Sequence, residues 1–183
     1  MANIDWDAIN KKLPTGPDSE SKKRRKELFS SFDNGNGILS LSEVEKGIQI
    51  VLKLEEFINA KPAIMRAFQI AKNSEVSKRS DGKGDDYIEL KEFRFFLLSL
   101  RQYFEYYVAF KQTDTDNDHR ISEEEFKAAQ PKFEKWVGPI EDVGGEFKKI
   151  DKNGGGWVLF DEFCDWAISK NLAIEAKSVD VDQ

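Results

Sequence analysis

Apolar side chains recur along this chain at the three- and four-residue spacing that places them on one face of an α-helix. Leu28, Phe29 and Phe32 form one such stripe, and Phe147 and Ile150 belong to another. The pattern predicts helices over residues 4–13, 19–32, 42–54, 62–73, 90–111, 123–136, 140–150 and 160–171. Pro131 lies inside one of these segments and should end or kink its helix. The predicted fold class is all-α.

Residues 114–125, DTDNDHRISEEE, match the calcium loop of an EF-hand between two of these helices. Calcium prefers about six to eight hard oxygen ligands, which a tight loop supplies from alternate side chains, one backbone carbonyl and a closing glutamate. The side chains in ligand places are Asp114, Asp116, Asp118 and Glu125, and Arg120 offers the carbonyl. His119 stands where glycine is expected, and we interpret it as a turn residue rather than a catalytic base.

Residues 151–162, DKNGGGWVLFDE, repeat this plan with fewer charges. The expected ligand places hold Asp151, Asn153, Gly155, Trp157 and Glu162. Gly155 leaves its place to water, and Trp157 offers its carbonyl. Because only two carboxylates reach the ion, we expect weaker binding here than at residues 114–125. Two acidic surface turns are the alternative, but both segments are followed by phenylalanine and both carry a β-branched residue at place eight.

Two further segments look degenerate. Residues 33–43, DNGNGILSLSE, run from Asp33 to Glu43 and are one residue too short for the alternating ligands to face one centre. Residues 81–92, DGKGDDYIELKE, place Lys83 in a ligand position, where its positive charge repels a cation. We expect both segments to bind calcium poorly or not at all.

The four segments make a repeat of four helix–loop–helix units, which we expect to be arranged as two pairs because one unit cannot bury its apolar face alone. Each pair should carry a short two-stranded β-bridge between its loops, as between Leu39 and Ile88. The expected organisation is an amino-terminal extension with a short helix (1–18), an amino-terminal EF-hand pair (19–103), a carboxy-terminal pair (104–171) and a polar tail (172–183).

Charge is divided unevenly along the chain. Residues 112–183 carry 9 basic and 17 acidic side chains, whereas residues 1–111 carry 19 basic and 17 acidic ones. The excess of negative charge therefore accompanies the two loops with the better ligand sets, as cation binding requires. The net charge of −6 argues against a general nucleic-acid-binding protein.

Compartment signals are few. Cys164 is the only cysteine, so an internal disulfide cannot form, which fits a reducing compartment. Residues 1–10 contain no apolar signal segment, and no apolar run approaches the length of a membrane span. The expected location is cytoplasmic.

A run of basic residues lies on the helix predicted for residues 19–32. Its members are Lys22, Lys23, Arg24, Arg25 and Lys26. One interpretation is a solvated helix face. The other is weak contact with an anionic membrane surface or an acidic partner.

Three functions follow from calcium (Ca2+) binding. The leading hypothesis is a sensor without enzymatic activity, whose carboxy-terminal pair changes helix geometry and presents an apolar surface to an unidentified protein target. The second is a buffer that binds without opening. A remote third is a calcium-triggered bioluminescent or luciferin-binding protein, which the single histidine, His119, disfavours. Cys164 has no second histidine to serve it in nucleophilic catalysis.

Several stretches carry a resemblance to a known family: KKRRKELFSSFD, VLKLEEF, DDYIELKEFR, SEEEFKAAQPKFEKW and FKKIDKNGGGWVLFDEF. From about Lys22 to Leu172 the chain resembles the calflagins, the flagellar calcium-binding proteins of trypanosomes. The resemblance implies two degenerate amino-terminal loops, two functional carboxy-terminal loops, a calcium-responsive signalling role, and a flagellum or cilium as the location. Calflagins are anchored by acyl chains on an amino-terminal glycine and a nearby cysteine. Here Ala2 follows Met1 and the only cysteine is Cys164, so that motif is absent.

Overall fold

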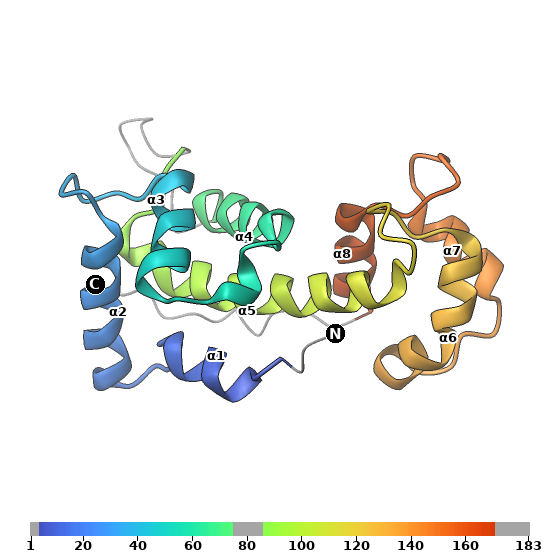
Figure 1. Ribbon diagram of the computed structural model, residues 1–183, viewed down its shortest axis with the longest axis horizontal. Helices are drawn as coiled ribbons and strands as arrows, with labels where there is room; N and C mark the ends of the chain where they lie inside the picture. Colours follow the sequence, from blue (N-terminus) through green and yellow to red (C-terminus); the bar gives the residue numbers. More distant parts are fainter. Residues whose placement is uncertain (1–3, 75–85, 171–183) are drawn as a thin grey trace. The chain divides into compact units, whose positions relative to one another are not determined.

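The computed structural model describes residues 4–74 and 86–170, and every regular element in that part of the chain is helical (Figure 1). The all-α prediction is therefore confirmed. The described residues form two compact units, 4–104 with its gap at 75–85, and 105–170. The boundary between them falls inside α5 (Leu90–Thr113).

The first unit contains the elements from the amino terminus to the first part of α5. They are α1 (Trp6–Lys12), α2 (Ser19–Phe32), α3 (Leu41–Lys46), the π-helix η1 (Gly47–Val51), the 3-10 helix η2 (Glu55–Phe57) and α4 (Lys61–Lys72). Side-chain caps explain where several of them begin. The Asp18 carboxylate accepts from the backbone N–H of Ser21 at 2.8 Å, and Ser40 and Glu43 form a capping box at the start of α3.

Aromatic rings fill the core of the first unit. Phe57 stacks on Phe104 with ring centroids 3.8 Å apart, and Phe93 meets the edges of Phe29 and Phe32. The predicted bridge between the two loops is present, since Leu39 and Ile88 exchange backbone hydrogen bonds of 2.8 and 2.9 Å.

The helix predicted over residues 42–54 is wrong in its second half. Regular α-helix ends at Lys46, a π-helix follows, and Lys53 takes a positive φ of 49°. The change from α-helix to π-helix occurs at Gly47, which packs so closely on the ring of Phe32 that an added Cβ would overlap it. Close packing against a neighbouring helix, rather than local propensity, sets this segment's path.

The expectation for the basic run needs a correction at Arg25. Its side chain is buried, and its Nη1 donates to the backbone carbonyls of Pro14 at 2.8 Å and Gly16 at 2.6 Å. Arg25 therefore holds the turn before α2 and is not available to a membrane surface. Lys23 and Lys26 are exposed.

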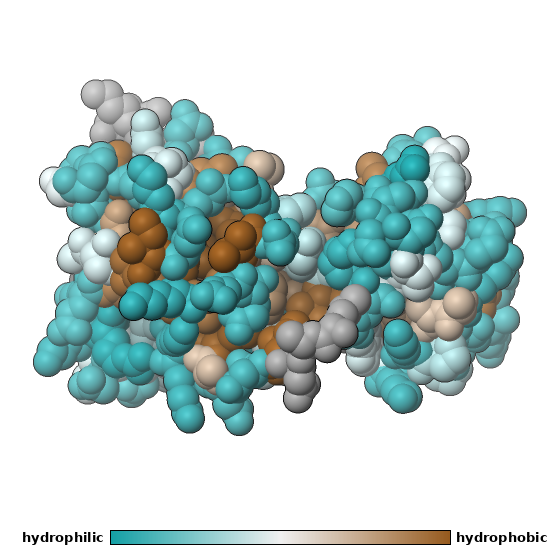
Figure 2. Space-filling model, viewed as in Figure 1, coloured by the Kyte–Doolittle hydropathy of each residue, from teal (hydrophilic) through white to brown (hydrophobic). Residues whose placement is uncertain are grey.

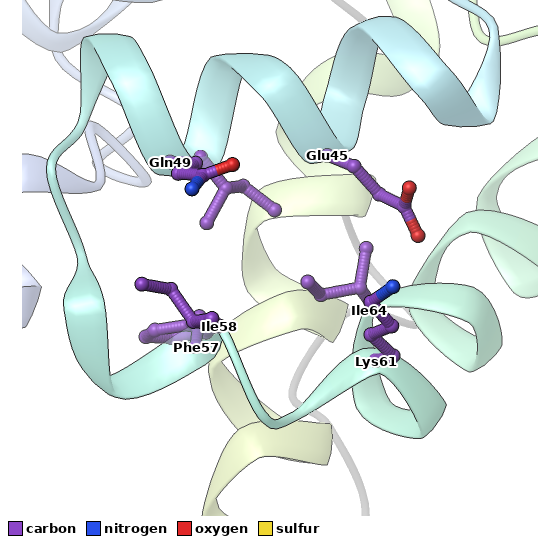
Figure 3. Close-up of a pocket in the computed structure, with 7 residues that line it drawn as sticks. Glu45, Gln49, Phe57, Ile58, Lys61 and Ile64 are labelled. Atoms are coloured by element: carbon purple, nitrogen blue, oxygen red, sulfur yellow. The ribbon is translucent and has the colours of Figure 1, made fainter.

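A cavity of about 270 Å³ opens in the first unit between η1, η2 and α4 (Figure 3). Ile48, Phe57 and Ile64 form its apolar floor, and Glu45 and Lys61 lie at its edge. Four large apolar side chains of this unit are solvent-exposed, namely Ile50, Val51, Ile58 and Met65. Figure 2 shows apolar surface, in brown, on this unit.

The second unit contains the end of α5 and three further helices, α6 (Glu123–Val137), α7 (Val143–Ile150) and α8 (Phe160–Ser169). Pro131 does not end α6, which continues to Val137 and stops at Gly138, where φ is 81°. The predicted start of the next helix at Ile140 is also displaced. It begins at Val143, because the Asp142 carboxylate caps it by accepting from the N–H of Gly145 at 2.9 Å.

An aromatic cluster forms the core of the second unit. Its members are Phe110, Phe126, Phe133, Phe147, Phe163 and Trp166. The indole N–H of Trp166 donates a hydrogen bond to the buried carboxylate of Glu146 at 2.8 Å, and this bond joins α8 to α7. Among the helices of the described residues, none combines the length and apolar character needed to cross a bilayer.

Candidate metal centre

Three aspartates converge after the end of α5. One carboxylate oxygen from each of Asp114, Asp116 and Asp118 lies within 4.8 Å of the others. The turn that brings them together needs left-handed backbone at Asn117, with φ of 62°, and at His119, with φ of 67°. His119 therefore takes the turn conformation expected of it.

Asp114 carries the clearest sign of a cation site. Its side chain is fully buried, and its Oδ2 accepts from Lys111 Nζ at 2.8 Å and from the His119 N–H at 3.2 Å. Its Oδ1 is buried with no hydrogen-bond partner. Leaving a buried carboxylate oxygen without a donor is costly, and a hard cation satisfies it. The residues present therefore fit calcium.

Asp116 and Asp118 are oriented by the loop backbone. Asp116 Oδ1 accepts from the N–H of Asp118 at 3.1 Å, and Asp118 Oδ1 accepts from the N–H of Arg120 at 2.9 Å. The other oxygen of Asp118 accepts from the Arg120 guanidinium, from Nε at 3.0 Å and from Nη2 at 2.8 Å.

Glu125 closes the loop from the first turn of α6. Its Oε1 accepts from the backbone N–H and hydroxyl of Thr115, and its Oε2 accepts from those of Ser122, at 2.7 to 2.9 Å. Burial raises the pKa of Glu125, but these hydrogen bonds outweigh it and lower the pKa to about 2. The carboxylate is therefore charged and held over the loop.

This low pKa predicts an acid dependence of stability in the presence of a calcium chelator. The Glu125 pKa is about 2 in the folded protein against an ordinary 4.5, so the unfolded chain binds this proton more tightly. The stabilising effect of the charged group is complete above pH 4.5 and disappears as the pH falls toward 2. We expect the difference in unfolding free energy between the wild type and Glu125→Gln to shrink across this range. Urea unfolding at each pH measures it, and a difference that stays constant contradicts the prediction.

The loop at residues 151–162 has the same plan and fewer carboxylates. Asp151 accepts from the N–H groups of Gly155 at 3.0 Å and Gly156 at 2.8 Å. Glu162 Oε1 accepts from the side-chain amide of Asn153 at 3.0 Å. Gly155 brings no side-chain oxygen. Among the described residues, three converging metal-binding side chains occur only in the cluster at residues 114–118.

The two loops meet at their seventh and eighth places. Ile121 and Val158 exchange backbone hydrogen bonds of 2.9 Å in each direction, the second bridge of the predicted fold. Trp157 is exposed, and the Arg120 guanidinium carbon lies 4.4 Å from its ring centroid. Sequence reasoning assigned Arg120 only a carbonyl and did not single out Lys111. The i,i+3 spacing of Lys111 and Asp114 was a usable signal for that pair.

In the loop at residues 33–43, hydrogen bonds from the chain itself engage the carboxylates. Asp33 accepts from the N–H groups of Gly35 at 2.9 Å, Asn36 at 3.0 Å and Gly37 at 3.0 Å. The bond from Gly35 is the main cause of a lowered pKa at Asp33. In the loop at residues 81–92, the positions of Asp81 and Lys83 lie outside the described residues.

Comparison with known proteins covers most of the chain. The model of the FCaBP EF-hand domain matches residues 9–100, and the model of the EF-hand domain pair matches residues 103–168. Flagellar calcium-binding protein TB-24 of Trypanosoma brucei brucei is 41% identical over 174 residues, which are 93% of this chain and 79% of that protein. The flagellar calcium-binding protein of Trypanosoma cruzi is 39% identical over 170 residues, 91% of this chain and 80% of that protein. TB-44A of Trypanosoma brucei brucei is 41% identical over 93% of this chain, which spans only 42% of its length.

Proposed function

Since this chain belongs to the flagellar calcium-binding protein family of EF-hand proteins, we propose that it is a calcium sensor whose carboxy-terminal pair changes helix geometry on binding. The proposed ligands at the tighter site are Asp114, Asp116, Asp118, the Arg120 carbonyl and Glu125. Those at the weaker site are Asp151, Asn153, a water at Gly155, the Trp157 carbonyl and Glu162. The buried, donorless Oδ1 of Asp114 inside the aspartate cluster is the observation that carries this assignment.

The closing glutamates connect the sites to the helices. Glu125 lies in the first turn of α6 and Glu162 in the first turn of α8, and each is hydrogen-bonded to its own loop. The next residue in each case, Phe126 or Phe163, is fully buried in the aromatic core. A displacement of either glutamate toward an ion therefore moves a helix and a core ring together.

The consequence for function is a change in exposed apolar surface. We expect binding of an apolar fluorescent dye to rise when calcium is added, because reorienting α6 and α8 uncovers rings that now pack on one another. The control is the double variant Glu125→Gln with Glu162→Gln, in which calcium should leave dye emission unchanged. Calcium uptake without a rise in dye emission would instead favour a buffer.

The family is a non-enzymatic calcium-binding class, and we propose no catalytic activity for this chain. By similarity to relatives named for the flagellum, we propose a flagellar location. The exposed residues Lys23, Arg24 and Lys26 on α2 support weak, salt-sensitive contact with an anionic membrane surface. We also propose that the uncovered apolar surface binds a protein target.

A further inference from the structure

The Arg120 side chain contacts both loops of the carboxy-terminal pair. Its guanidinium donates to Asp118 Oδ2 from two nitrogens, at 2.8 and 3.0 Å. The same group lies over the indole of Trp157, with 4.4 Å between the guanidinium carbon and the ring centroid. Asp118 is a proposed ligand of the first site and Trp157 of the second, so one side chain contacts a ligand residue of each.

The β-bridge between the loops holds Arg120 and Trp157 in this arrangement. Arg120 and Trp157 immediately precede Ile121 and Val158, whose mutual backbone hydrogen bonds fix the register of the two loops. In this antiparallel register Arg120 and Trp157 are diagonal neighbours on the same face of the bridge, within reach of a long side chain. A planar guanidinium can pair with a carboxylate and stack on an aromatic face at once, which a lysine ammonium cannot do as well.

Both carboxylate oxygens of Asp118 accept hydrogen bonds from Arg120. Its Oδ1 accepts from the backbone N–H of Arg120, and its Oδ2 accepts from the guanidinium. The backbone bond is compatible with a ligand role, since it leaves the second oxygen to face the ion. The guanidinium bond opposes that role, because it places a positive charge beside the oxygen that would face the ion. Calcium and the Arg120 side chain therefore compete for Asp118 Oδ2.

We propose, resting on the function proposed above, that Arg120 is a positioning residue that links the two calcium loops. Its guanidinium opposes calcium at Asp118, and filling of the loop at residues 114–125 is transmitted to Trp157 through the same group. The side chains of Arg120 and Asp118 are 44% and 26% exposed, so the competition is moderate. Removing the guanidinium should tighten binding at the first site by about two- to fivefold, the range of a partly exposed ion pair.

The test uses the full chain with Glu162→Gln, so that only the first site fills. Calorimetry gives the affinity, and subtracting spectra of the same protein with Trp157→Phe isolates the emission of Trp157. We expect calcium to change Trp157 emission in this background. Adding Arg120→Gln should tighten binding about two- to fivefold and abolish the Trp157 response. Arg120→Lys keeps the positive charge, so its calcium affinity and its Trp157 response should lie between those measured with Arg120 and with Arg120→Gln. Circular dichroism verifies that each variant is folded.

A matched control separates direct contact from the general electric field. Lys127 also carries a positive charge near this loop but pairs with Glu123 at 2.7 Å and with none of the proposed ligands. Lys127→Gln should retain the Trp157 response, and its effect on affinity should vanish at high salt. Unchanged affinity together with an intact Trp157 response in Arg120→Gln overturns this inference. Absence of calcium binding in every protein overturns the proposed function itself.

Discussion

Glu125→Gln should remove one of two bound calcium ions from this protein. Glu125 is the proposed closing ligand, and its carboxylate is held over the loop by Thr115 and Ser122. An amide offers one oxygen in place of two and carries no charge. We expect affinity at this site to fall by about 100-fold or more, because ligand charge and geometry tune EF-hand affinities over several orders of magnitude.

Calorimetric titration of the intact chain provides the measurement. We expect about two ions per molecule in the wild type, one in Glu125→Gln and one in Glu162→Gln, since each hand contributes one site. Glu124→Gln is the matched control, because Glu124 is exposed on the neighbouring position of α6 and is not a proposed ligand. An unchanged ion count in Glu125→Gln, or uptake that depends on Asp33 instead, contradicts the assignment.

Phe133→Ala should strongly destabilise the second unit. Phe133 is fully buried in the second unit, and its ring meets those of Phe126, Phe163 and Trp166 at centroid distances of 5.0 to 5.9 Å. Removing a buried phenylalanine ring costs about 3–5 kcal/mol, through lost burial and the cavity left behind. Urea unfolding in the presence of a chelator measures this, because bound calcium would add stability of its own.

Trp136→Ala is the control for the core substitution. Trp136 is 46% exposed and lies near the end of the same helix, so its removal leaves most of the aromatic cluster in place. We expect a loss well below that of Phe133→Ala. Equal losses for the two variants would show that the cluster around Phe133 does not dominate the stability of this unit.

Most of the helical framework could be predicted because its signals are local. The stripe of Leu28, Phe29 and Phe32 lies in a helix that begins at Ser19 and ends at Phe32, as expected. The eighth-place residues Ile121 and Val158 form the expected bridge because they stand at equal distances from the starts of their loops. A repeated spacing along the chain is enough to specify such features.

Departures from prediction lie where a distant segment decides the outcome. Pro131 does not end its helix, which was one of its two expected effects, because Phe126 before it and Phe133 after it are both buried against the rest of the second unit. Gly47 begins a π-helix where it passes the ring of Phe32. Propensity alone cannot anticipate these results, because packing energy exceeds the small local preferences.

The sequence by itself determined the spacing of the chain: four acidic loop segments, two of them with oxygen-bearing side chains at most of the ligand places of a calcium loop, each between amphipathic helices. These features depend on spacing within twelve residues, so no knowledge of distant contacts is needed. Only the tertiary structure decided that Arg25 is buried beneath the turn at Pro14 and that Arg120 spans Asp118 and Trp157. A long basic side chain can reach many partners, and which one it meets depends on what the fold brings within its reach.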